Sequence, residues 1–222
     1  MAGLIAMNTV QRPMITDILT LAQLLSPSFP VGAFAYSHGL ETAVNDRLIY
    51  DATTLQGWLL DLLDFGGAQS DATFLNAAYN SDDPDIDTTA RSFAASAERL
   101  MEIDLQGAAF CDTVSAIWGH EIGQLCYPVA VGRTAKILNL DPELTTAMYL
   151  QAFIGNLTTA AMRLLPLGQV AGQKIQTMLK PRIVEIAAKS IGGTLEDLHS
   201  SAWMSDITAM RHETQYSRVF RS

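Results

Sequence analysis

The sequence is poor in cysteine and lacks the common catalytic and metal-binding motifs. Its only two cysteines, Cys111 and Cys126, form no CxxC pair. Their number and spacing predict neither a disulfide framework nor a zinc site, so both are expected to be free thiols that pack as small apolar side chains. HExxH, P-loop, GxGxxG and GxSxG patterns are all absent. We therefore expect no catalytic residue, no bound metal and no cofactor.

Basic residues are scarce as well. The chain of 222 residues has 14 Lys and Arg against 23 Asp and Glu, which gives a net charge of −9. An acidic chain is a poor partner for nucleic acid. Charged residues make up only 17% of the sequence and hydrophobic ones 49%, a balance that excludes overall disorder. Because this is more apolar surface than one monomer core requires, we expect a homodimer or a larger assembly.

No stretch of the sequence is apolar enough to predict a membrane-spanning helix. Residues 144–162 carry no charge, but they include several threonines, a glutamine and an asparagine, whereas a span needs about 20 predominantly apolar residues. We expect this stretch to be the buried central helix of a bundle. A membrane-peripheral protein that uses it is the alternative. Residues 1–10 lack the basic region of a signal peptide, so a cytoplasmic protein is expected.

Helical periodicity dominates the sequence, and no stretch alternates apolar and polar residues for long enough to predict a sheet. Capping residues and prolines mark several helix starts, such as Asp51 and Asp141-Pro142. The predicted helices cover residues 14–25, 34–45, 51 to the loop at 81–85 with a break or bend at 66–67, 86–102, 105–122, 127–139, 141–165 and 169–190, with a restart at 194. We therefore predict one all-α domain, residues 1–222, built as a single-domain helical bundle of roughly eight to ten helices.

Residues 26–41 form the most unusual segment of the chain. Prolines, glycines, aromatic residues and hydroxyls are concentrated there, between two helical patterns. Pro27 and Pro30 restrict the backbone, while Gly32 and Gly39 permit tight turns or close approach by another chain. Aromatic side chains are costly to leave in such a segment unless they pack against something. The segment is therefore not an ordinary polar loop.

Two further segments stand out by composition. In residues 163–169 a proline inside an apolar helix is expected to kink the axis, and Arg163 or Gln169 could donate to the freed carbonyls. Such a kink serves packing alone or faces a partner. The C-terminal tail, residues 212–222, combines aromatic anchors with cations, and tyrosine and arginine are enriched at binding hot spots. We expect the tail to be disordered when free and ordered on a partner; a tail folded back on its own bundle is the alternative.

Together these three segments resemble the signatures of the urease accessory protein UreF family. The resemblance rests on residues 26–41, 163–169 and 216–222, and residues 127–132 and 139–140 fit as well. The matches run in order from about Leu21 to the last residue, so they cover nearly the whole chain. His38 and Val219 are mild departures, because glutamine and leucine are common at these places in the family. The acidic stretch around residues 81–87 matches no part of the pattern.

The resemblance implies an all-helical homodimer without catalytic activity of its own. Such proteins bind UreD (also called UreH) and recruit UreG, a GTPase that carries nickel, and the assembly delivers Ni²⁺ to apo-urease. Modulation of GTP hydrolysis by UreG is a further hypothesis. The resemblance also implies that residues 30–41 and the end of the tail contact UreD. The partner-binding residues expected on this basis are Pro30, Gly32, Phe34, Tyr36, Ser37, His38, Gly39, Glu41, Arg163, Gln169, Tyr216, Arg218, Phe220, Arg221 and Ser222.

A helical enzyme is the alternative from a different class of protein. It would bring together His38, His120, Glu121 or Cys126 across helices. His212, which precedes Glu213, could touch a metal in a complex. Stoichiometric metal in the purified protein, or turnover without partners, would favour this alternative.

Overall fold

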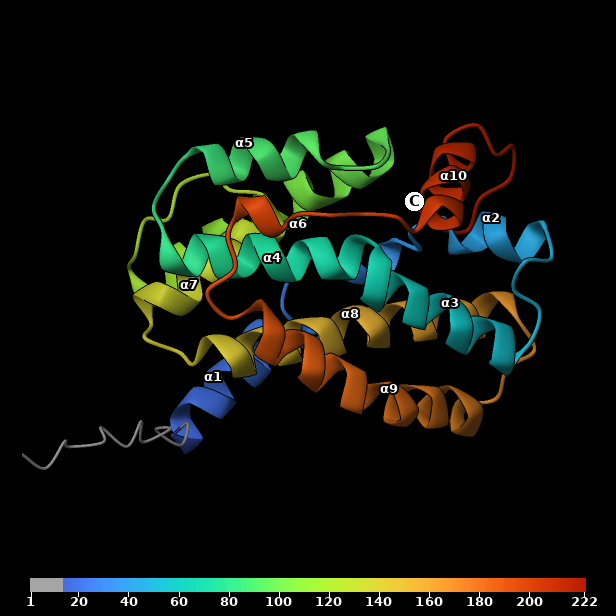
Figure 1. Ribbon diagram of the computed structural model, residues 1–222, viewed down its shortest axis with the longest axis horizontal. Coiled ribbons are helices and arrows are strands. Elements are labelled where there is room, and N and C mark those ends of the chain that lie inside the picture. Colours follow the sequence, from blue (N-terminus) through green and yellow to red (C-terminus); the bar gives the residue numbers. More distant parts are fainter. Residues whose placement is uncertain (1–13) are drawn as a thin grey trace, which may run out of the picture.

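The computed structural model describes residues 14–222 and contains only helices and connecting segments in that range (Figure 1). Ten α-helices and two 3₁₀ turns follow one another, which confirms the predicted all-α fold and helix number. The expectation about a signal peptide concerns residues 1–10, which lie outside the described residues. The elements are α1 (Ile15–Leu24), η1 (Ala33–Ala35), α2 (Leu40–Asn45), α3 (Ala52–Phe65), α4 (Gly67–Asn80), α5 (Asp85–Ser92), α6 (Ala97–Trp118), α7 (Tyr127–Ile137), α8 (Pro142–Leu164), α9 (Gln169–Ser190), η2 (Leu195–Asp197) and α10 (Trp203–His212).

Helices α4, α8 and α9 lie side by side, and α7 packs between α4 and α6. Figure 1 shows the segment after α9 running back along α4 to α10, which lies beside α2. The main core is formed by fully buried leucine, isoleucine and phenylalanine side chains from α3, α4, α6, α8 and α9. A second, smaller core around Phe74 and Ile103 fills the space between α4, α5, α6 and α7.

The uncharged stretch 144–162 lies within α8, and ten of the 23 residues of this helix are buried, in line with the prediction. Its buried threonine hydroxyls are satisfied locally: Thr145, Thr146 and Thr158 each donate to the carbonyl four residues earlier. This explains how a helix with so many threonines can occupy the centre of the bundle. Within residues 14–222, no helix has both the length and the apolarity that crossing a bilayer demands.

Several helix boundaries follow the predicted signals. The Asp51 carboxylate accepts from the Thr54 amide at the start of α3, and Asp141 accepts from the Leu144 amide at the start of α8. Thr194 and Asp197 form the expected reciprocal cap, although it opens only the short turn η2. Cys111 and Cys126 are free and buried, as expected, and burial raises the pKa of both thiols.

Other boundaries were predicted wrongly. Residues 34–45 are not one helix, because His38 and Gly39 have positive φ angles of 53° and 73° and separate η1 from α2. The break between α5 and α6 lies at 93–96 instead of 103–104, where Ser96 caps α6 by accepting from the Arg99 amide. α6 then ends at Trp118, and the left-handed backbone of Gly119 follows it.

The ends of α8 and α9 lie close to the predicted ones, but the expected kink inside one helix is wrong. α8 ends at Leu164 and α9 begins at Gln169, so Pro166 separates two helices and does not kink one. The helix α10 was not predicted, and its start has no side-chain cap.

Two glycines allow helices to approach more closely than any side chain would permit. A Cβ atom on Gly107 of α6 would lie 2.1 Å from the Leu125 carbonyl oxygen, and one on Gly132 of α7 would lie 2.1 Å from that of Leu75 in α4. The two glycines thus permit the close α4–α7 and α6–α7 contacts. These contacts position α4 and α6, the helices that carry the buried charges described below.

Candidate partner-binding site

The C-terminal tail is folded against the turn at residues 36–41, which is the arrangement that the sequence left as an alternative. The Ser37 amide donates to the Ser222 carbonyl oxygen at 2.7 Å, and the Ser37 hydroxyl donates to the same atom. The Arg221 amide donates to the Ala35 carbonyl at 2.8 Å. Residues 26–41 and the tail, which both stood out by composition, are therefore in direct contact.

The Glu41 carboxylate is the main acceptor for the tail backbone. It is buried in the first turn of α2 and accepts from the amides of Val219, at 2.8 Å, and Phe220, at 2.9 Å. Hydrogen bonds to an ionised acceptor are stronger than neutral ones. A single side chain of α2 thus fixes two consecutive residues of the tail.

His212, the last residue of α10, is completely buried between two carboxylates. Its Nδ1 lies 2.7 Å from Glu98 Oε2 in α6, and its Nε2 lies 3.5 Å from Glu41 Oε2. Arg218 Nη1 reaches the other oxygen of Glu98 at 2.6 Å. Because the two carboxylates face different ring nitrogens, they do not share one metal position with His212; the ring ties α10 to α2 and α6.

Gly39 allows α10 to lie directly on the turn. A Cβ atom at this position would be 2.4 Å from the Ala209 amide nitrogen, and the positive φ also favours glycine. Farther along the contact, the Thr42 hydroxyl donates to the Gln215 side-chain oxygen at 2.9 Å. The glycine therefore serves a backbone contact within this chain.

Phe220 anchors the end of the tail. Its ring is buried, and the Arg163 guanidinium lies 4.7 Å from the ring centroid. This cation–π contact joins the end of α8 to the tail. Arg163 thus contributes through an aromatic face and not, as the sequence suggested, through carbonyls freed by a proline.

The remaining predicted residues differ in where they lie. Tyr36 is buried and Gly32 has a left-handed backbone with φ of 71°. Tyr216 is fully exposed, and Phe34 and Val219 are also largely exposed. Phe34 is nevertheless next to Ala35, whose carbonyl accepts from the Arg221 amide. No hydrogen bond or ion pair joins Pro30 or Gln169 to the tail within residues 14–222; both are exposed, as is the Arg221 side chain.

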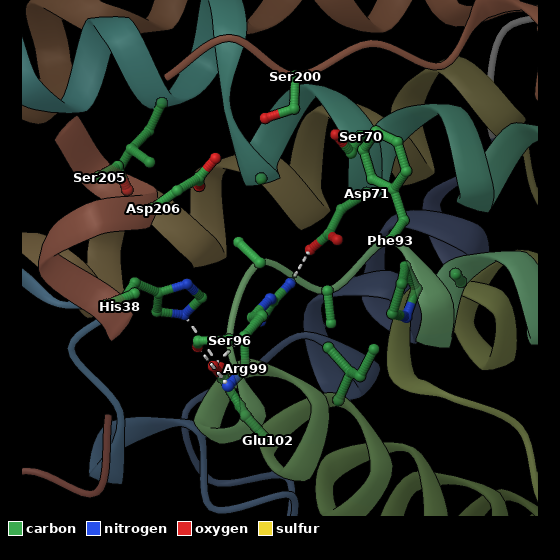
Figure 2. Close-up of a pocket in the computed structure, with 18 of the residues that line it drawn as sticks. His38, Ser70, Asp71, Phe93, Ser96, Arg99, Glu102, Ser200, Ser205 and Asp206 are labelled. Carbon is green, nitrogen blue, oxygen red and sulfur yellow. Dashed lines mark hydrogen bonds and ion pairs between the residues drawn. The ribbon is translucent and has the colours of Figure 1, made fainter. Parts of the chain in front are cut away.

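A network of buried charges lies beneath the turn, along the wall of a cavity (Figure 2). Arg99 of α6 donates to Asp71 of α4 at 2.6 Å and lies 3.1 Å from Glu102. His38 Nε2 lies 3.0 Å from the other oxygen of Glu102, and the Tyr149 hydroxyl donates to Asp71 at 2.7 Å. The turn is therefore connected through these side chains to α4, α6 and α8.

The charges in this network stabilise one another. Burial opposes ionisation of Glu102, but the charges of His38 and Arg99 outweigh it and lower the pKa of Glu102 to about 2. Burial alone would lower the pKa of Arg99, yet Asp71 and Glu102 raise it above its ordinary value. Burial and the charge of Asp71 raise the pKa of Tyr149, so its hydroxyl remains a donor. Within this network, Arg99 and Glu102 are therefore both charged at neutral pH, and Tyr149 keeps its proton.

The cavity beside the network is small, with a volume of about 60 Å³. It has room for water but not for the usual small-molecule ligand, which needs several hundred Å³. Within residues 14–222, no three His, Cys, Asp or Glu side chains are placed to hold a metal ion. His120 and Glu121 are exposed beyond the end of α6, whereas Cys126 is buried and starts α7. The side chains considered for an enzyme therefore occupy different environments.

Sequence reasoning did not identify Asp71, Glu98, Arg99 or Glu102 as part of this region. On the sequence they resemble the solvated charges of amphipathic helices, and only the packing of α4, α6 and the turn buries them. His212 was considered only as a metal contact. The spacing of Glu98 and Glu102, four residues apart on one face of α6, was the only available signal.

Comparisons with known proteins agree with this arrangement of motifs along the chain. A family model described as UreF matches residues 49–180. A relative from Ruegeria pomeroyi named urease accessory protein UreF is 48% identical over 210 residues, which cover 93% of this chain and 97% of the relative. The protein of that name from Roseobacter denitrificans is 48% identical over 219 residues, covering 97% and 99% of the two chains. The one from Ruegeria sp. (strain TM1040) is 50% identical over 208 residues, covering 92% and 97%. The chain thus belongs to the UreF family of urease accessory proteins.

Proposed function

We propose that this protein is a non-catalytic scaffold of urease maturation in the cytoplasm. It binds UreD (UreH), recruits the GTPase UreG and supports GTP-dependent insertion of nickel into apo-urease. The observation that carries the proposal is the match to urease accessory proteins over nearly the whole chain. The tail and the turn at residues 36–41 form the proposed contact with UreD.

Exposed apolar side chains on and beside the tail support this contact. The Val219 amide is held by Glu41, and Phe34 and Tyr216 are next to Ala35 and Gln215, whose backbones are hydrogen-bonded. An exposed side chain on fixed backbone loses little conformational freedom when a partner covers it. The helix α10, which leads into the tail, also exposes Trp203, Met204, Ile207 and Met210.

Affinity for UreD tests the proposal. Tyr216→Ala and Val219→Ala remove exposed side chains, so we expect them to fold normally and to weaken UreD binding by roughly 2 kcal/mol for the better anchor. Val184→Ala, on the exposed face of α9, is the matched control and should bind like the unmodified protein. Arg218 is a less clean probe because it already pairs with Glu98. Unchanged affinity in both tail variants would remove the tail from the contact.

The wider role is tested in a strain that lacks the gene for this protein. We expect nickel content and urease activity to be lost and then restored by the unmodified chain. A scaffold that leaves the nucleotide untouched predicts that GTP turnover by UreG does not change when this protein and UreD are added; a changed rate would favour modulation. The proposed homodimer is tested by measuring the mass of the protein in solution.

A further inference from the structure

A second recessed site lies between the end of α3 and the start of α10. Trp58, Asp61 and Phe65 line it from α3, and Trp203 and Met204 line it from α10. The three α3 residues are three and four positions apart, so they lie along one face of that helix. We call this site the aromatic pocket. None of its residues belongs to the tail or to the buried charge network.

The walls of the aromatic pocket are fixed by backbone contacts. The Phe65 carbonyl oxygen, at the last residue of α3, accepts from the amides of Ser201 at 2.7 Å and Ala202 at 3.1 Å. Gly66 lets the two segments meet, because a Cβ atom there would lie 3.0 Å from the Ala202 Cβ. Trp203 therefore faces α3 from a segment that is held in place, which preorganises the site.

The charge in the aromatic pocket is unbalanced. Asp61 is exposed and has no ion pair within residues 14–222, whereas Asp64, three residues later, pairs with Arg182 at 2.5 Å. A lone carboxylate among tryptophan and phenylalanine rings attracts a cation, through the aromatic faces and through the carboxylate.

We propose that the aromatic pocket binds an arginine side chain of a partner polypeptide. A guanidinium group can stack on an aromatic ring and donate to a carboxylate at the same time, which an ammonium group does less well. The pocket volume of about 240 Å³ suits one side chain and is below the usual size of a small-molecule site. The exposed face of α10 continues from the pocket through Ile207 and Met210, so a polypeptide could cover both. This proposal rests on the proposed function where it takes UreD as the partner.

The chemistry of the aromatic pocket can be tested on the full chain with N-acetyl-arginine methylamide. We expect this probe to shift the indole N–H resonances of Trp203 and Trp58 but not that of Trp118, which lies at the end of α6. The neutral isostere N-acetyl-citrulline methylamide should bind about tenfold more weakly, as should the arginine probe with the Asp61→Asn variant. Equal shifts with both probes, or an unchanged Asp61→Asn variant, would overturn the proposal. Tighter binding of choline than of the arginine probe would also overturn it, in favour of a small ammonium ligand.

The partner contact is tested separately. Asp61→Asn should weaken binding of UreD about tenfold, and a rise in salt should weaken binding of the unmodified protein more than binding of this variant. Glu121→Gln removes one exposed negative charge outside the pocket and should leave the affinity unchanged. Failure of the unmodified protein to bind UreD would contradict the proposed function. Normal binding by Asp61→Asn would contradict only the role of the pocket.

Discussion

The amide nitrogen of Ser37 lies 2.7 Å from the carbonyl oxygen of Ser222, across a separation of 185 positions in the sequence. Together with Glu41 and His212, this pair makes the tail part of the folded domain. A substitution in the tail can therefore act on stability as well as on a partner. Removing residues 212–222 altogether would take away the buried His212, so single substitutions at exposed tail positions give the clearer answer.

Glu41→Gln should loosen the tail. The variant keeps the shape of the side chain but loses the negative charge that accepts from the Val219 and Phe220 amides and faces His212. We expect a loss of about 2 kcal/mol in the free energy of unfolding and faster hydrogen exchange of the two amides. Glu121→Gln, at an exposed position between α6 and α7, should stay within about 0.5 kcal/mol of the unmodified protein. Protected amides in Glu41→Gln would contradict this role.

Gly39→Ala should be strongly destabilising. The new methyl group would meet the backbone of α10 at 2.4 Å, and alanine is strained at the positive φ of this residue. We expect a cost of more than about 3 kcal/mol in urea denaturation. The matched control is Gly57→Ala in the middle of α3, where no atom lies within 4 Å; it should be stabilising by about 0.5–1 kcal/mol because alanine favours a helix. Similar stabilities of the two variants would refute the close contact.

A second pair of glycines tests the packing of α4 against α7. Gly132→Ala would place a methyl group 2.1 Å from the Leu75 carbonyl oxygen, whereas Gly155→Ala in α8 would meet only the Gln176 side-chain oxygen at an ordinary 3.6 Å. We expect Gly132→Ala to lower the melting temperature by at least 10 °C if the domain still folds, since each kcal/mol shifts it by about 2–4 °C at this size. Gly155→Ala should match or exceed the unmodified protein. A Gly132→Ala protein with normal melting would show that the helices can separate without cost.

Stability should fall in acid partly through Glu102. Its pKa is about 2 in the folded chain against an ordinary 4.5, so between these values the unfolded chain binds more protons than the folded one. The stabilisation is complete above about pH 4.5 and is lost as the pH falls towards 2; it amounts to at most about 3 kcal/mol. Glu102→Gln should be less stable at pH 7 but show a shallower decline from pH 4.5 to 2.5.

A high salt concentration distinguishes the contribution of buried Glu102 to acid stability from that of exposed carboxylates. The Glu102 contribution should persist in 1 M NaCl because the group is buried, whereas contributions of exposed carboxylates are screened. Equal slopes for Glu102→Gln and the unmodified protein at high salt would assign the acid sensitivity to other groups.

The parts of the fold that were predictable are those whose ends depend on local chemistry. Asp51 and Asp141 cap the helices that follow them, so α3 and α8 start where the sequence indicates. The end of α6 and the division of residues 34–45 depend on left-handed backbone at Gly119 and His38. α10 is held by the distant Phe65 carbonyl, which no local pattern records.

The candidate site likewise has a part that the sequence predicts and a part that it does not. The composition of the turn and the tail singled out these two segments, but nothing in the sequence indicated that Glu41 pairs with the backbone near Phe220. Arg99 and Glu102 look like surface charges until α4 and the turn cover them. Pairings between distant segments depend on the packed structure, and a periodic pattern within one helix does not contain that information.

The contact between Ser37 and Ser222 has a consequence for how the chain is made. A ribosome that adds about 5–20 residues per second needs roughly 10–40 s to travel from one serine to the other. Throughout that interval the nascent polypeptide lacks the last piece that Glu41 and Ser37 bind. A product of premature termination would lack the backbone groups of residues 219–222 with which Glu41 and Ser37 form hydrogen bonds.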